Sequence, residues 1–378
     1  MAAQHPTDRM SPERREVVVV GGGQAGLAIG YFLARQGRDF VILEAAEEPA
    51  AAWRERWDSL QLFTSARYNS LPGLAFPGDP DSYPGRDAVA GYLTDYVRHF
   101  DLPVALDSRV RSIQRANSGY AVALDDRIYQ SEQVVVATGP FQVPFVPAMA
   151  QRLDTKVVQL HSTAYRRADS IPQGRVLVVG GGNTGFQIAA ELSDSHEVHL
   201  SIGSRQTPLP QRILGRDLFW YLERTGLIRK STASRVGRRL AGRDTLIGSS
   251  PRVLRRRHGV QLHKRAVDAA GSTMRFDDGT TLDVGSVLWA TGFRLDHSFI
   301  DVPVFDHDGR LEHRRGVTDS PGLYFLGLTW QHTRGSALLG WVKDDAEFIA
   351  QQIDAFRPIA QDEARRRSVQ ADITGSTT

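Results

Sequence analysis

The 378-residue chain contains no cysteine. Disulfide bonds, thiolate zinc sites and dithiol electron relays are therefore excluded. No apolar run approaches the roughly 18 residues that a membrane-crossing helix needs, and the polar N-terminal segment does not resemble a secretory signal. The lack of a membrane-crossing segment and of a secretory signal predicts a cytoplasmic protein without membrane insertion.

The usual motifs of hydrolases and metalloenzymes are missing as well. The chain has no GxSxG elbow and no Walker loop. The two histidines of HEVH, at 196–199, fall on an expected strand and would point to its opposite faces. We therefore predict no metal site.

Positive charge is concentrated in one region. The whole chain has 46 Lys and Arg against 43 Asp and Glu, whereas residues 205–265 hold sixteen basic residues and three acids. Such a block suits phosphates, nucleic acid or an acidic partner. We interpret it as a solvated helical face with one phosphate-binding patch, and expect no nucleic-acid partner.

Two segments of the chain are nearly the same: VVVVGGGQAG at 17–26 and VLVVGGGNTG at 176–185. Each follows an apolar strand, opens a helical pattern and precedes a second strand, which is typical of a dinucleotide-binding βαβ unit. The glycines allow the tight turn, the approach of a pyrophosphate and close helix packing. The predicted loop residues are Gly21, Gly23, Gln24, Ala25 and Gly26 in the first unit, and Gly180, Gly182, Asn183, Thr184 and Gly185 in the second.

Each unit closes on a buried strand ending in ATG, which adds Thr138, Gly139, Thr291 and Gly292 to the predicted sites. The repeated plan predicts an α/β fold of two dinucleotide-binding, Rossmann-like domains of the glutathione-reductase type, the second inserted in the first. The expected parts are a discontinuous FAD-binding domain at 12–145 and 292–358, an NADPH-binding domain at 146–291 with an Arg-rich helical insertion at about 209–257, and flexible termini at 1–11 and 359–378.

The end of the second strand distinguishes the two sites. Glu44 stands there in the first unit, where a carboxylate accepts hydrogen bonds from ribose hydroxyls and repels a 2′-phosphate. In the second unit Ser204 and Arg205 take this place, and an arginine suits the extra phosphate of NADP. The alternative for Arg205 is an ordinary surface arginine. The pair predicts tightly held FAD and transient NADPH, hence hydride transfer to a flavin.

A helix starting near Ser336 would direct its positive N-terminus at the flavin ring; the alternative is a plain C-terminal docking helix. Loops before this helix and after the second strand supply the other candidates. The predicted surroundings of the ring are Trp53, Arg56, Trp57, Thr64, Gly327, Trp330, His332, Arg334, Ser336, Ala337 and Leu338.

Together these motifs resemble the class B flavin monooxygenases, and most closely their short YUCCA-type and CzcO-like subgroup. The resemblance covers about 15–355 and rests on GGGQAG, GGGNTG, both ATG strings, SRQTPLP and GLYFLGLTWQHTRGSALLG. The family's linker signature falls on 155–165, where His161 and Tyr165 match. Ser65 stands where many members have an asparagine beside the flavin.

The resemblance implies that NADPH reduces FAD and that O2 then forms a C4a-(hydro)peroxyflavin. This species oxygenates a small organic nitrogen, sulfur or carbonyl substrate. His161, Ser65, Thr64 and His332 are the candidate catalytic residues, although His161 is equally well explained as a structural histidine of the linker.

Two other functions remain open at this stage. A reductase or oxidase of the same plan would pass electrons to a protein, a quinone or O2 without oxygenation. A non-catalytic NADPH sensor would bind a partner through the basic 205–265 face. The sequence leaves the substrate and the oligomeric state undetermined.

Overall fold

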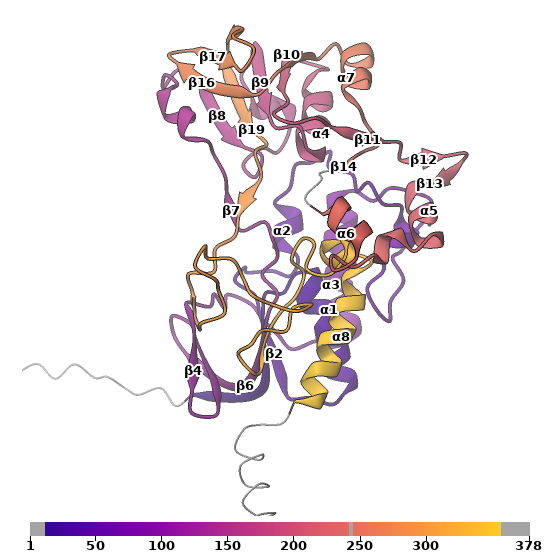
Figure 1. Cartoon of the computed structure of the whole chain (residues 1–378), viewed down its shortest axis with the longest axis vertical. Helices are drawn as coiled ribbons and strands as arrows, with labels where there is room; N and C mark the ends of the chain where they lie inside the picture. Colours follow the sequence, from indigo (N-terminus) through magenta and orange to yellow (C-terminus); the bar gives the residue numbers. More distant parts are fainter. Residues whose placement is uncertain (1–11, 242–244, 357–378) are drawn as a thin grey trace, which may run out of the picture.

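The computed structural model describes residues 12–241 and 245–356; the predicted flexible ends, 1–11 and 359–378, lie outside the described residues. Two sheets dominate the molecule, one in each lobe (Figure 1). The chain leaves the first lobe through β7 (Val143–Pro144) and returns through β20 (Phe293–Arg294), and these two strands pair with each other. A short antiparallel ladder therefore connects the lobes.

The first sheet, in the described residues, has the order β21-β4-β5-β6-β1-β2-β3, with β22 beside β6. Its strands are β1 (Glu13–Val20), β2 (Phe40–Leu43), β3 (Val104–Ala105), β4 (Ser112–Ala116), β5 (Gly119–Ala123), β6 (Ile128–Val136), β21 (Ile300–Asp301) and β22 (Leu323–Phe325). Alternate valines of β1 belong to different cores, Val17 and Val19 to one and Val18 and Val20 to the other. A continuous valine run is needed here because both faces of the strand are covered.

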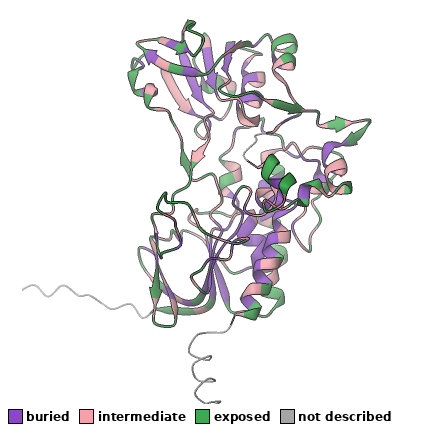
Figure 2. Cartoon of the chain, in the orientation of Figure 1, coloured by how far each residue is buried: buried purple, intermediate pink, exposed green. Residues whose placement is uncertain are grey.

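Three helices cover one face of this sheet: α1 (Gln24–Arg35), α3 (Arg86–His99) and α8 (Val342–Ala355). The C-terminal α8 packs along the N-terminal α1, although they lie at opposite ends of the described chain (Figure 1). The short elements nearby are α2 (Ala51–Arg54) and the 3-10 turns η1 (Ala66–Tyr68) and η5 (Arg334–Ala337). Burial is concentrated in the sheet and in the inner helix faces (Figure 2).

The second sheet is parallel throughout, in the order β15-β10-β9-β19-β8. Its strands are β8 (Val158–His161), β9 (Arg175–Val179), β10 (Glu197–Ser201), β15 (Gln261–His263) and β19 (Ser286–Trp289), with α4 (Asn183–Leu192) between β9 and β10. An antiparallel sheet of β16 (Ala266–Ala270), β17 (Thr273–Phe276) and β18 (Thr281–Asp283) packs on it together with η2 (Ala148–Arg152); η3 is Ala168–Ser170. A hairpin turn around 277–279 joins β17 to β18.

The insertion at 209–257 is only partly helical, which corrects the sequence prediction. Its described helices are α5 (Leu218–Arg224), η4 (Leu227–Arg229), α6 (Arg235–Leu240) and α7 (Pro251–Arg257). It also contains the hairpin β12 (Arg212–Ile213) and β13 (Arg216–Asp217), and β14 (Thr245–Ile247), which pairs with β11 (Thr207–Leu209). Pro208 and Pro210 prevent a helix at its start, and Gly215 allows the hairpin turn.

This insertion reaches back to the first lobe. Trp341 donates through Nε1 to Glu223 at 3.0 Å, and the Trp341 ring stacks on Tyr68 with centroids 5.8 Å apart. Arg229 donates to Asp344 of α8 at 3.0 Å. The insertion therefore links the two lobes independently of the β7–β20 ladder.

Candidate functional site

One large cavity, of about 1440 Å³, extends between the two glycine-rich loops. A pocket for one small ligand typically has roughly 300–1,000 Å³, so this cavity is large for one ligand. Its lining includes 23 of the predicted site residues: Gly21, Gly23, Gln24, Ala25, Glu44, Trp53, Arg56, Trp57, Thr64, Thr138, Gly139, Gly180, Gly182, Asn183, Thr184, Ser204, Thr291, Gly292, Gly327, Trp330, Arg334, Ala337 and Leu338. Gly26, Ser65, His161, Gly185, Arg205, His332 and Ser336 are not among its lining residues.

The first loop connects β1 to α1 with no room for side chains at its turn. Gly21 has φ +108°, and a Cβ there would lie 2.7 Å from the carbonyl oxygen of Ala137. A Cβ on Gly26 would lie 1.9 Å from the carbonyl oxygen of Gly21. At Gly23, by contrast, a Cβ would meet no atom within 4 Å. The middle glycine therefore opens the helix N-terminus to a ligand, while the other two allow the turn to close.

The second loop, between β9 and α4, repeats this geometry. Gly180 has φ +137°, and its Cβ would lie 2.1 Å from the carbonyl oxygen of Ala290. A Cβ on Gly185 would lie 2.1 Å from the carbonyl oxygen of Gly180, whereas a Cβ on Gly182 would meet no atom within 4 Å. Ala137 and Ala290 are the first residues of the two ATG strings. In each lobe, therefore, the first residue of the ATG string packs its backbone carbonyl directly against the first glycine of the loop.

The ends of β2 and β10 carry groups of opposite charge: an acidic side chain stands at the end of β2, and a basic one lies beside the end of β10. Glu44 accepts hydrogen bonds from the backbone N–H of Gly22 at 2.8 Å and of Ala46 at 3.0 Å. In the second lobe Arg265 donates through Nε and Nη2 to the carbonyl oxygen of Gly203, at 3.1 and 2.7 Å. Arg265 lines the cavity, whereas Arg205 is exposed outside it. No local sequence pattern indicates Arg265, because β15 becomes the neighbour of β10 only in the folded sheet.

The cavity wall in the first lobe contains polar groups that fit a bound ligand. Trp57 is 4% exposed, and its Nε1 has no hydrogen-bond partner among the described residues. Thr64 donates to Oδ1 of Asn69 at 2.6 Å, and Nδ2 of Asn69 donates to the carbonyls of Thr64 and Ser65 at 3.1 Å each. Asn69 lines the cavity, and no motif in the sequence had indicated it.

Arg56 also lines the cavity and lies beside a pair of rings that contact each other, 5.4 Å from the centroid of Phe141 and 5.7 Å from that of Phe293. These rings belong to the two segments that connect the lobes. Burial lowers the pKa of Arg56 from its usual value. A guanidinium held by aromatic faces in this way retains donors for an anionic group.

His161 lies at the end of β8, beside the connection between the lobes. Its Nε2 is 3.1 Å from the carbonyl oxygen of Gly292, so this nitrogen donates, and its Nδ1 is 3.1 Å from Oγ1 of Thr163. Burial, with a smaller contribution from the charge of Arg56, lowers the pKa of His161. The bond to Gly292 therefore ties β8 to the segment that returns to the first lobe, whereas the contact with Thr163 is local.

The helix predicted from Ser336 begins later, at Val342. Residues 334–337 instead form the turn η5, closed by reciprocal hydrogen bonds between Thr333 and Ser336. Leu338 is extended at ψ 141°, and a Cβ on Gly340 would lie 1.9 Å from the carbonyl oxygen of Tyr68. This close approach of two chain segments interrupts the helix. His332 faces the insertion, since its carbonyl accepts from the N–H of Thr232 at 2.8 Å.

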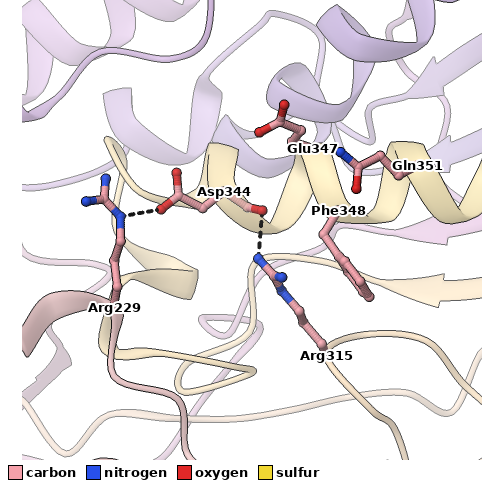
Figure 3. A pocket seen from close by; sticks show the side chains of 6 residues that line it. All are labelled: Arg229, Arg315, Asp344, Glu347, Phe348 and Gln351. Atoms are coloured by element: carbon pink, nitrogen blue, oxygen red, sulfur yellow. Dashed lines mark hydrogen bonds and ion pairs between the residues drawn. The ribbon is translucent and has the colours of Figure 1, made fainter. Parts of the chain in front are cut away.

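A smaller cavity of about 390 Å³ lies where the insertion meets α8 (Figure 3). Its lining residues are Arg229, Arg315, Asp344, Glu347, Phe348 and Gln351. Arg229 pairs with the carboxylate of Asp344, and Arg315 donates to the carbonyl of Asp344 and to Asp345. Its arginines therefore already have partners within the protein.

Comparison with known proteins identifies the family. Residues 18–211 match the model of the pyridine nucleotide-disulphide oxidoreductases. The chain belongs to this family. Among members of it, the CzcO-like oxidoreductase of Geobacillus kaustophilus is 42% identical over 340 residues, which cover 89% of this chain and 98% of that protein. The probable indole-3-pyruvate monooxygenase YUCCA1 of Arabidopsis thaliana is 25% identical over 384 residues, covering 90% of each.

The solved structure of the flavin-containing monooxygenase from Stenotrophomonas maltophilia has a TM-score of 0.77 to this chain at 29% identity, covering 91% of this chain and 99% of the other. The predicted two-domain α/β fold, the use of FAD and NADPH, and the oxidoreductase class are thereby confirmed. The alternative of a non-catalytic sensor is wrong. No helix in the described residues is long and apolar enough to cross a membrane.

Proposed function

We propose that the protein is an NADPH-dependent FAD monooxygenase that oxygenates a small organic nitrogen, sulfur or carbonyl compound with O2. The supporting observation is that both glycine-rich loops, each with an open middle glycine, border the same cavity. Two dinucleotides bound at these loops would bring the nicotinamide ring and the flavin ring together in the shared cavity, as hydride transfer requires.

In this proposal the lobes divide the cofactors. Residues 12–145 and 292–358 hold FAD, with the N-terminus of α1 at the pyrophosphate and Glu44 at the ribose. Residues 146–291 hold NADPH, with the N-terminus of α4 at the pyrophosphate and Arg265 and Arg205 at the 2′-phosphate. When bound, FAD supplies the ring that accepts the hydride and activates O2.

The chain's own residues would orient the reactants. The backbone N–H groups of the two helix N-termini anchor the pyrophosphates, so the reactive rings are placed by rigid elements. Thr64 and Asn69, locked to each other, present fixed dipoles to the cavity. Phe63, Leu338 and Leu339 add apolar wall that keeps water away from the reacting atoms.

The test is the fate of isotopically labelled O2. FAD-loaded protein is mixed with NADPH and, separately, with an amine, a thioether and a ketone, and the consumed NADPH, the released peroxide and the labelled product are measured. Oxygenation predicts label in a product and a matching decrease in peroxide. Peroxide equal to the oxidised NADPH with every compound would instead identify an oxidase.

A further inference from the structure

The tip of the β12–β13 hairpin is an exposed leucine in a strained backbone position. Ile213 pairs with Arg216, so the turn consists of Leu214 and Gly215, and both have positive φ, 47° and 77°. Such turns favour Asn-Gly, because a larger side chain clashes with its own backbone there. Leu214 is nevertheless 94% exposed. Strain combined with full exposure of an apolar side chain indicates a function at the tip.

The charges around this tip are positive. Arg212 donates to the carbonyl of Gly215 at 3.3 Å, and the guanidinium of Arg216 lies 4.6 Å from the ring centroid of Trp220. Among residues 12–241 and 245–356, the partners of these two side chains are a carbonyl oxygen and an aromatic ring, and none is a carboxylate. Both guanidinium groups are exposed beside Leu214.

The described acids of the insertion point inward. Asp217 is 6% exposed and accepts from the N–H of Phe219 at the start of α5. Glu223 accepts from Trp341 of the first lobe. The outer surface of the insertion is therefore basic, and α6 repeats the same composition, with exposed Val236 and Leu240 one turn apart among arginines.

We propose that this hairpin docks the protein on an anionic phospholipid surface, with Leu214 entering the interface and Arg212 and Arg216 contacting phosphate headgroups. The hairpin projects from the edge of the molecule (Figure 1). A stable protein interface buries roughly 800 Å² on each partner, more than one convex tip offers. An apolar side chain flanked by arginines, with a tryptophan against one of them, instead matches an interfacial binding site, in which each arginine near an anionic surface contributes about 1 kcal/mol.

Docking in this orientation would bring the lipid close to the large cavity. Gln211, at the base of the hairpin, donates to the carbonyl of Phe63 at 3.5 Å, and Phe63 lines the cavity. An apolar substrate dissolved in the bilayer would then lie near the cavity wall. The docking itself does not depend on the proposed reaction.

The experiment is sedimentation of the full chain with vesicles of phosphatidylcholine containing phosphatidylserine, compared with phosphatidylcholine alone. We expect binding to the anionic vesicles only. Leu214→Asn should weaken it about tenfold, and Arg212→Gln or Arg216→Gln about fivefold each. Because asparagine suits the turn, Leu214→Asn should unfold at the same temperature as the wild type or above it.

Leu295→Asn, which changes an equally apolar side chain that is 51% exposed elsewhere, is the matched control and should bind as the wild type does. Absence of wild-type binding to anionic vesicles, or full binding by Leu214→Asn, would overturn the proposal. Self-association that is lost in Leu214→Asn, without vesicle binding, would assign the tip to a second copy of the chain instead.

Discussion

The carboxylate of Glu44 accepts the backbone N–H of Gly22 at 2.8 Å, so the end of β2 is tied directly to the first glycine loop. Glu44→Ala should release FAD, because it removes the proposed hydrogen bonds from the ribose hydroxyls to the carboxylate as well as the bond that positions the loop. A hydrogen bond to a charged acceptor is worth about 1.5–3 kcal/mol. The ratio of FAD to protein after desalting measures this. Glu47→Ala, an exposed neighbour, serves as control; an FAD ratio in Glu44→Ala equal to the control's would contradict the assignment.

The middle glycines allow each nucleotide site to be blocked without disturbing the fold. A side chain at Gly23 or Gly182 meets only open space. Gly23→Val should therefore fold but bind no FAD, and Gly182→Val should keep FAD but lose NADPH affinity at least tenfold. Flavin absorbance and NADPH titration distinguish the two variants. If Gly182→Val lost FAD and Gly23→Val kept it, the two sites would have been assigned the wrong way round.

Arg265 should contribute more to NADPH selectivity than Arg205, since Arg265 lines the cavity and is held by Gly203. Arg265→Ala should raise the KM for NADPH roughly tenfold or more, corresponding to about 1.5–3 kcal/mol, and change that for NADH little. Arg205→Ala should have a smaller selective effect. Arg252→Ala, exposed on α7, is the control. An equal rise for NADH in Arg265→Ala would refute a phosphate contact.

Local patterns predicted the repeated units well, because the strand, glycine turn and helix are contiguous in sequence. What the sequence missed depends on segments that meet only in space. Gly340 breaks the predicted helix at Ser336 by packing on Tyr68, and Arg265 joins the site because β15 pairs with β10. Asn69 lies in an irregular loop that has no periodic pattern.

A histidine pair, one member buried and the other half-buried, should make stability sensitive to acid. Nδ1 of His199 lies 2.8 Å from Nε2 of His263, and burial lowers the pKa of both. The unfolded chain therefore binds protons first as the pH falls below about 6.5. Stability is fully present above that pH and decreases through the lowered pKa of the folded state.

His199→Gln should flatten this decrease, and His307→Gln, whose side chain is 90% exposed, should not. Urea unfolding at several pH values between neutral and weakly acidic would measure the effect. An acid limb that is as steep in His199→Gln as in the wild type would show that the pair does not cause it.

The central claim is that NADPH on the second loop delivers a hydride to FAD on the first across one shared cavity. Anaerobic rapid mixing of FAD-loaded protein with NADPH tests it most directly. The account predicts that the visible flavin absorbance disappears in step with NADPH oxidation in the wild type, and much more slowly in Gly182→Val. Flavin absorbance that persists in the wild type at saturating NADPH would contradict it.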